Sequence, residues 1–331
     1  MRIIGSERML DFNYVSKERT GIMDLLAPER QITMFSSGRS ASYCLFKSLK
    51  SPSLVLFPDF YCPSMLLPVK EAGHETRFYH INNDFTADID SLSPLIEEAD
   101  IIYITDYFGF RDNALFEFLD NRDIGTVIDR THSILSVFDN AGDCELASFR
   151  KIIPVPDGGY FTGCENQCAL TEESSLFPII KTYAKILRYM HETTDSSSEI
   201  ENHYVKYSTE SERMISCSPS AISPLSSHII SHYPVKESAA DRRKNYNYLY
   251  SELKEYCPLK LDSNSVPQSM PILIENRNKI KLLLQQKDIY APVLWRCDNI
   301  ISDYLLNLPC DEEYGIDDMK RIIMSLRECG L

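Results

Sequence analysis

The sequence predicts an α/β fold in which a large domain with a mostly parallel sheet precedes a small C-terminal α+β domain. From about residue 35, short apolar runs alternate with segments of helical spacing, a pattern typical of parallel strands joined by helical crossovers. After Leu170 the chain becomes more polar and more helix-prone. We therefore expect a large domain over residues 1–215, including an N-terminal segment, and a small domain over residues 216–331.

The strands expected in the large domain are short apolar runs that end at a proline, a carboxylate or a glycine turn. In chain order they are residues 53–57, 77–81, 101–105, 126–129, 146–149 and 159–162. Helical spacing predicts helices at residues 41–49 and in segments that begin near Pro63, Asp90 and Asn113.

The second half of the chain is expected to be richer in helix. The spacing predicts helices at residues 179–191, 242–253, 278–287 and 316–326, with short strands near residues 270–274. Residues 193–201 are rich in Ser and acidic side chains, so a loop is expected there.

Composition excludes several classes of protein. The 34 Lys and Arg face 48 Asp and Glu, and this net charge of -14 would repel a nucleic-acid backbone. The longest apolar stretches fall far short of the ~20 residues that cross a bilayer. Residues 1–10 lack the apolar core of a secretion signal. We therefore expect a cytoplasmic protein with no nucleic-acid or membrane partner.

The ten cysteines are scattered from Cys44 to Cys329 without a C-x-x-C pair, so we expect reduced thiols. Cys164 and Cys168 have no second pair at zinc-ligand spacing, and no metal site is expected. The signatures G-x-G-x-x-G and G-x-x-x-x-G-K-[ST] are also absent from the sequence, which removes the support for Rossmann dehydrogenases and P-loop NTPases.

Three short segments could carry chemistry, although each also has a purely structural interpretation. Residues 37–40 (Ser-Gly-Arg-Ser) precede a helix, where backbone N–H groups could hold a phosphate or simply form a turn and a cap. Asp129 ends an apolar strand, where α/β sheets bind ligands or where an acid caps the next segment. Lys151 precedes the glycine-closed loop 152–160, as a reactive amine or as a solvated surface charge.

Together these segments supply the groups that pyridoxal 5'-phosphate requires. This cofactor needs a lysine for a covalent link, a carboxylate that keeps its pyridine nitrogen protonated, and a phosphate cup. Lys151 follows Asp129 by twenty-two residues, and the phosphate turn precedes both. The conjunction is more specific than any of its parts.

The same segments resemble the DegT/DnrJ/EryC1/StrS family of sugar aminotransferases, which are pyridoxal phosphate enzymes of fold type I. The most specific matches are residues 127–132 (Val-Ile-Asp-Arg-Thr-His), 148–151 (Ser-Phe-Arg-Lys) and 157–159 (Asp-Gly-Gly). The resemblance covers most of the chain and extends through residues 35–41, 57–63, 71–75, 88–90, 106–109, 242–246 and 308–311, and Tyr314.

The resemblance implies roles for the residues nearest the cofactor ring. Lys151 would bind the cofactor covalently and later carry the proton between the substrate and the cofactor. Asp129 would pair with the pyridine nitrogen. His132 stands where the family has Gln or His near the ring oxygen. Gly38 and Arg39, with Ser148, would hold the phosphate.

Three departures from the family pattern accompany these matches. The aromatic residue that stacks on the cofactor ring would fall at Cys62, so Tyr61 is a candidate for stacking, with ordinary core packing as its alternative. Residues 216–223 offer serines where the family supplies Asn or Arg to the partner subunit's phosphate. At 331 residues, the chain is also shorter than is usual for the family. Trp295 is interpreted as a packing residue, and Arg242 and Arg243 as part of a solvated helix face.

The activity implied by the resemblance is an aminotransferase that works by a ping-pong mechanism. An amino acid, expected to be glutamate, would donate the amino group, and a nucleotide-linked keto sugar would accept it for polysaccharide or related glycan biosynthesis. A homodimer is expected, because the sites in this family lie at the subunit interface. Two alternatives stay open. One is a lyase or dehydratase that uses the same cofactor, against which the retained Lys151 argues. The other is a noncatalytic protein of this fold with a regulatory or assembly role.

Overall fold

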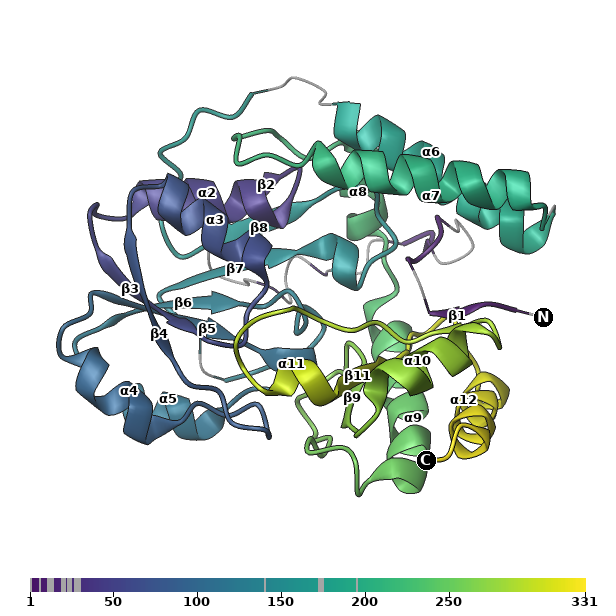
Figure 1. The fold of residues 1–331 in the computed structure, drawn as a ribbon. Coiled ribbons are helices and arrows are strands. Elements are labelled where there is room, and N and C mark those ends of the chain that lie inside the picture. The colour runs from purple at the N-terminus through teal and green to yellow at the C-terminus, as the bar shows by residue number, and fades with distance from the viewer. Residues whose placement is uncertain are drawn as a thin grey trace.

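The computed structural model describes residues 2–5, 7–10, 15–18, 22, 26, 31–139, 141–171, 176–194 and 196–331. A seven-stranded sheet lies at the centre of its large part (Figure 1). The strand order is β2-β8-β7-β6-β5-β3-β4. The strands are β2 (Ile32–Phe35), β3 (Leu54–Pro58), β4 (Glu75–Tyr79), β5 (Ile101–Thr105), β6 (Gly125–Asp129), β7 (Cys144–Ser148) and β8 (Gly159–Thr162).

The sheet is mostly parallel, as the sequence predicts. Strands β4, β3, β5, β6 and β7 run in one direction, and only β8 is antiparallel to its two neighbours in this sheet. Residues 101–104 of β5 are buried, as is typical of a central strand with both faces covered. The carboxyl ends of the parallel strands therefore meet at one edge, where Asp129 ends β6.

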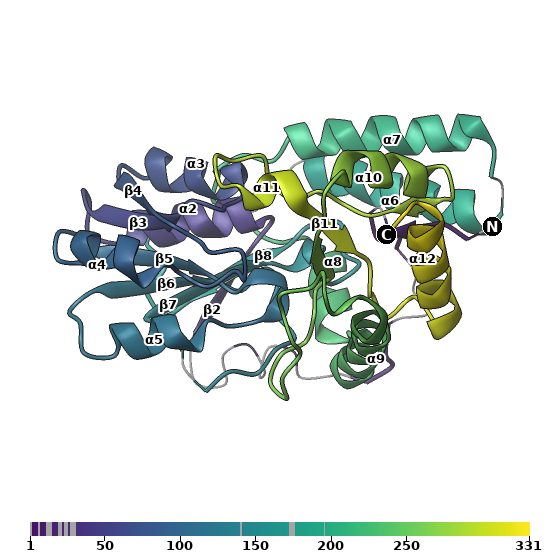
Figure 2. The same cartoon turned by 60° about the horizontal axis from the view of Figure 1, so that its bottom comes forward.

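Helices cover both faces of this sheet. The helices α2 (Gly38–Ser48) and α3 (Pro63–Glu71) pack on one face, where their apolar residues share a cluster with Phe57 and Tyr103. The helices α4 (Ile89–Ile96) and α5 (Asn113–Leu119) pack on the other, in a cluster with Ile102 and Ile104. Figure 1 shows α2 and α3 above the sheet and α4 and α5 below it, and Figure 2 gives the same elements in a view turned by 60°.

The helices α6 (Leu176–Thr193) and α7 (Ser198–Arg213) form a pair beside the sheet (Figure 1). The predicted loop at residues 193–201 is therefore wrong at Thr193, where α6 ends, and from Ser198 onward, where α7 begins. Ser197 caps the new helix by accepting a hydrogen bond from the backbone of Ile200, and Tyr204 is buried against Ala184 and Leu187 of α6. Burial against α6 stabilises a segment that is too polar to be recognised as a helix.

The C-terminal part is built from helices and two small sheets. Strand β11 (Leu305–Leu308) pairs with β9 (Met270–Leu273) in an antiparallel ladder. The N-terminal strand β1 (Ile4–Gly5) pairs in parallel with β10 (Ile289–Tyr290). The predicted boundary at residue 215 stays a prediction. The elements of this part are α8 (Pro224–Ser231), α9 (Val235–Leu253), β9 (Met270–Leu273), α10 (Arg277–Gln285), β10 (Ile289–Tyr290), α11 (Ile301–Tyr304), β11 (Leu305–Leu308) and α12 (Ile316–Glu328).

Arg242 of α9 is fully buried, so the expected solvated face is wrong at this residue. Its guanidinium pairs with Asp311 at 2.6 Å and with Glu312 at 2.8 Å. Arg243 instead donates hydrogen bonds of 2.9 Å to the carbonyls of Ser263 and Ser265. A run of charges on a helix does not reveal which of them meets buried partners. In the described part of the chain, no helix is long and apolar enough to cross a membrane.

Candidate active site

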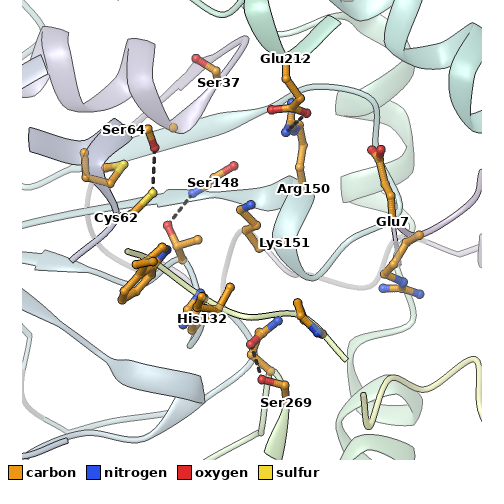
Figure 3. A pocket seen from close by; sticks show the side chains of 18 of the residues that line it. Glu7, Ser37, Cys62, Ser64, His132, Ser148, Arg150, Lys151, Glu212 and Ser269 are labelled. Atoms are coloured by element: carbon orange, nitrogen blue, oxygen red, sulfur yellow. Dashed lines mark hydrogen bonds and ion pairs between the residues drawn. The ribbon is translucent and has the colours of Figure 1, made fainter. Parts of the chain in front are cut away.

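A cavity of ≈ 390 Å³ lies at the carboxyl edge of the sheet, between the large part and the C-terminal part of the chain (Figure 3). This volume falls within the range of about 300–1,000 Å³ that is typical of small-molecule sites. The structure brings six predicted residues together in its wall: Gly38, Arg39, Asp129, His132, Ser148 and Lys151.

Asp129 presents a buried carboxylate to this cavity. It accepts hydrogen bonds of 2.8 Å from the hydroxyl of Tyr103 and from the backbone N–H of Thr131. Burial raises the pKa of Asp129, although these hydrogen bonds oppose the rise. No Lys, Arg or His among the described residues forms an ion pair with it. The carboxylate is thus held in place while its charge is left for a ligand.

The N-terminus of α2 forms a second wall of the cavity. Ser37 caps the helix by accepting a hydrogen bond of 3.0 Å from the backbone of Ser40. A Cβ atom on Gly38 would lie 2.8 Å from Cβ of Ser148, and one on Gly159 would lie 2.5 Å from the backbone nitrogen of Gly38. Only glycines allow this close approach, which sets backbone N–H groups and a helix N-terminus toward the cavity.

Arg39 follows Gly38 in the same wall, but its guanidinium donates to the carbonyl of Ile215. The loop that begins at Ile215 therefore lies against the start of α2. Ser40 also reaches it, through a hydrogen bond of 3.4 Å from its hydroxyl to the carbonyl of Ser216.

Lys151 ends the short 3-10 helix η3 (Phe149–Lys151) and extends into the cavity near Ser148 (Figure 3). No ion pair of Lys151 is present among the described residues. The other lysine in the cavity wall, Lys181, is fully engaged: its Nζ lies 2.8 Å from Glu7 and 2.7 Å from Glu212. Of the two lysines in the described cavity wall, Lys151 is therefore the one whose amine is not held in a salt bridge.

His132 lies three residues beyond Asp129 and is kept neutral by its surroundings. Burial, and then the charge of Lys151, lower the pKa of His132 to about 3. Its Nδ1 accepts a hydrogen bond of 3.3 Å from the backbone N–H of Phe108. The ring proton is therefore on Nε2, which can donate to a ligand.

Tyr61 is not among the described residues that line the cavity. Its ring stacks on Phe78 with centroids 5.3 Å apart, and it meets Phe57 edge to face. The packing alternative fits this position better than stacking on a ligand. Its neighbour Cys62 does line the cavity, with Sγ 2.9 Å from Oγ of Ser64.

Sequence reasoning missed the charged end of the cavity. Glu7 and Glu212 flank Lys181, and Arg150 lies 2.6 Å from Glu212. Burial alone would raise the pKa of Glu7, but the ammonium groups of Lys185 and Lys181 hold it well below its usual range. Glu7 comes from the N-terminal segment, Lys181 from α6, Glu212 from α7 and Arg150 from η3, so no local motif joins them. Thr131, by contrast, could be recognised from the sequence, because an acidic residue followed two positions later by Thr indicates a turn.

A mostly parallel sheet with helices on both faces and a cavity at its carboxyl edge is the fold type I architecture that the sequence predicts. No family model matches the chain, and no curated protein matches its sequence. Solved structures do match, over nearly the whole chain. A DegT/DnrJ/EryC1/StrS aminotransferase from Brucella abortus superposes with a TM-score of 0.66 at 14% identity, covering 96% of this chain and 91% of that one.

Two further solved structures are similar to the chain. PseC of Helicobacter pylori, an aminotransferase involved in the biosynthesis of pseudoaminic acid, gives a TM-score of 0.70 at 16% identity, covering 99% of each chain. GDP-4-keto-6-deoxy-D-mannose-3-dehydratase of E. coli, with bound hydrated PLP, gives 0.67 at 16% identity, covering 96% of this chain and 92% of that one. The chain has the fold of the DegT/DnrJ/EryC1/StrS aminotransferases.

Proposed function

We propose that this protein is a pyridoxal 5'-phosphate-dependent aminotransferase. It transfers an amino group from an amino acid, with glutamate as the expected donor, to a nucleotide-linked keto sugar. The observation that carries the proposal is the convergence of Asp129, Lys151 and the N-terminus of α2 on one cavity. Three groups that are scattered in the sequence meet there, and each suits a different part of one cofactor.

The residues in the cavity fit this cofactor. Asp129 is a buried carboxylate without a cationic partner among the described residues, as a protonated pyridine nitrogen requires. The close packing of Gly38 on Ser148 leaves a helix N-terminus free to bind a phosphate. Lys151 would form the covalent link. When bound, pyridoxal phosphate supplies an electron sink and an amino-group carrier.

The other residues orient the reactants and move protons. Tyr103 and Thr131 hold the Asp129 carboxylate toward the place of the ring nitrogen, and their hydrogen bonds favour its charged form against the effect of burial. His132 would donate a hydrogen bond from Nε2 to the ring oxygen of the cofactor. With the cofactor bound, Nζ of Lys151 would act as general base and acid: it would take the proton from the α-carbon of the donor and deliver it to the cofactor carbon that carries the amino group.

The substrate class is supported by the fold neighbours. PseC is an aminotransferase involved in the biosynthesis of pseudoaminic acid, and the dehydratase of E. coli is named for a GDP-linked keto sugar. That dehydratase also keeps the second function in view, a dehydratase on the same cofactor. The presence of Lys151 in the cavity favours amino transfer. The expected location is the cytoplasm.

We also propose that the protein is a homodimer. The outer face of α6 carries apolar side chains at helical spacing that the chain leaves exposed: Leu176 (65%), Ile179 (58%), Tyr183 (46%), Ile186 (41%) and Met190 (38%). A contiguous exposed stripe of this kind is typical of an interface. We call these five residues the α6 stripe.

The activity is tested with the purified protein, pyridoxal phosphate, L-glutamate and a panel of nucleotide-linked keto sugars. An aminotransferase forms one amino sugar for each 2-oxoglutarate released, so both products are measured by mass spectrometry. A deoxygenated sugar without the amino group would identify a dehydratase. If glutamate changes neither the cofactor absorbance nor the sugars, the noncatalytic alternative is supported instead.

A further inference from the structure

Trp295 is the single tryptophan of the chain, and it lines the cavity from the C-terminal part. Among the described residues of the cavity wall, it is the only aromatic ring besides the imidazole of His132. The rest of that wall is polar, charged, aliphatic or glycine. A flat heteroaromatic ligand in this cavity would find its aromatic contact there.

The backbone of Trp295 adopts an uncommon conformation. Its φ of 48 lies in the left-handed region, which bulky side chains rarely occupy. Such conformations persist only where surrounding contacts over-determine them, and they are concentrated at functional sites. The segment that carries it, between β10 and α11, has no regular secondary structure.

Two aromatic rings of the large part pack against the indole. Its ring centroid lies 5.0 Å from that of Phe60 and 6.1 Å from that of Tyr107. The same segment is tied to the loop after β3, where Nδ2 of Asn299 donates a hydrogen bond of 2.7 Å to Asp59. This loop continues to Cys62, which also lines the cavity.

The indole also lies nearly parallel to the imidazole of His132. Its plane is 13° from that of the His132 ring, with centroids 5.6 Å apart. Phe108 lies near the same imidazole, at 5.7 Å and 29°. The orientation of Trp295 is therefore fixed beside the carboxylate and imidazole that would hold the ring of a ligand.

We propose that Trp295 is a positioning residue that supplies the aromatic face for the cofactor's pyridine ring, a role that no residue of the β3–α3 loop fills in this chain. This inference rests on the proposed function. It assigns a binding role to a residue that sequence reasoning interpreted as packing. It also makes the C-terminal part a contributor to cofactor binding, together with Asp129 and Lys151 from the sheet.

The test uses the fluorescence of the full chain, because all tryptophan emission comes from Trp295. Cofactor-free protein is titrated with pyridoxal 5'-phosphate, and the emission is followed together with the visible absorbance of the bound cofactor. We expect saturable quenching of the emission with the same midpoint as the absorbance change. Quenching reports proximity, so affinity must be measured as well.

The affinity is compared in Trp295→Ala and Trp295→Phe. We expect the dissociation constant to rise about tenfold in the Ala variant and less than about threefold in the Phe variant, because a ring stack contributes beyond its buried area. Tyr304→Ala is the matched control, since it removes an exposed ring nine residues along the chain and should leave the affinity unchanged. Circular dichroism of each variant verifies folding, and the wild-type titration and the Phe variant remain informative if the Ala variant unfolds.

The outcomes separate this inference from the proposed function. If the wild type gains visible absorbance while its emission is unchanged, or if Trp295→Ala binds as tightly as the wild type, the role of Trp295 is refuted and the proposed function stands. If the wild type shows neither a visible band nor a change in emission, both are refuted.

Discussion

The hydroxyl of Tyr103 donates a hydrogen bond of 2.8 Å to Oδ2 of Asp129, across two paired strands of the sheet. Burial raises the pKa of Asp129, and this hydrogen bond lowers it. Strand β6, which ends at Asp129, thus sets the position of the carboxylate, while the hydrogen bond from Tyr103 on β5 favours the charged form of Asp129.

Tyr103→Phe removes that donor and should weaken cofactor binding. A hydrogen bond to a charged group contributes ~1.5–3 kcal/mol, so we expect the dissociation constant of pyridoxal phosphate to rise roughly 10- to 100-fold. Tyr160→Phe is the control, because the buried Tyr160 hydroxyl has no hydrogen-bond partner among the described residues. Equal affinities in the two variants, measured by absorbance titration, would contradict this role of Tyr103.

Gly38→Ala should disturb the anion-binding wall. Its Cβ would lie 2.8 Å from Cβ of Ser148, so α2 or the end of β7 must shift. We expect a loss of ~1–3 kcal/mol in the free energy of unfolding, together with weaker binding of pyridoxal phosphate. Gly315→Ala is the control, because nothing lies within 4 Å of the added Cβ. Chemical denaturation and cofactor titration of both variants provide the test, and unchanged binding in Gly38→Ala would argue against a phosphate site here.

The neutral state of His132 makes the stability of the protein depend on pH. The pKa of His132 is lowered to about 3 in the folded chain, against 6.5 ordinarily. Between these values the unfolded chain binds a proton that the folded chain does not, so the free energy of unfolding falls as the pH drops through this window. In His132→Asn this contribution is absent.

The measurement is chemical denaturation at pH 6.5 and at about pH 5, a range chosen to lie above the titration of most carboxylates. We expect the free energy of unfolding to fall more steeply in the wild type than in His132→Asn. Parallel pH dependence in the two proteins would show that His132 is not the neutral, buried group described above.

Ile179→Glu should dissociate the proposed homodimer. A charge in the centre of the α6 stripe would have to be buried on association, so we expect the dimer dissociation constant to rise about 100-fold. Leu282→Glu is the control, because Leu282 is also exposed (61%) but lies on α10. Light scattering over a concentration series gives the mass of each protein. A wild-type monomer, or equal effects of the two changes, would contradict this interface.

The sheet could be predicted because its signals are local. The strand at residues 101–105 was readable as a continuous apolar run, and β5 occupies the same residues. Asp129 and Lys151 could be assigned to one edge, since each follows a strand of recognisable pattern. The start of α7 was misread as a loop because its composition is polar and its stability comes from contact with α6.

The C-terminal contribution to the site could not be read from the sequence. Trp295 reaches the cavity from an irregular segment, through contacts with Phe60 and His132 that are more than 160 residues away in sequence. Glu7 and Lys181 meet for the same reason, by packing of distant segments. Local periodicity carries no information on such pairs.

The covalent link to Lys151 is the central claim, and its most direct test is reduction with sodium borohydride followed by peptide mass spectrometry. The protein is loaded with pyridoxal phosphate, reduced, digested and mapped. We expect the mass of the reduced cofactor on the peptide that contains Lys151, and no such label in Lys151→Ala. A label on another lysine such as Lys181, or no stoichiometric label at all, would contradict the account.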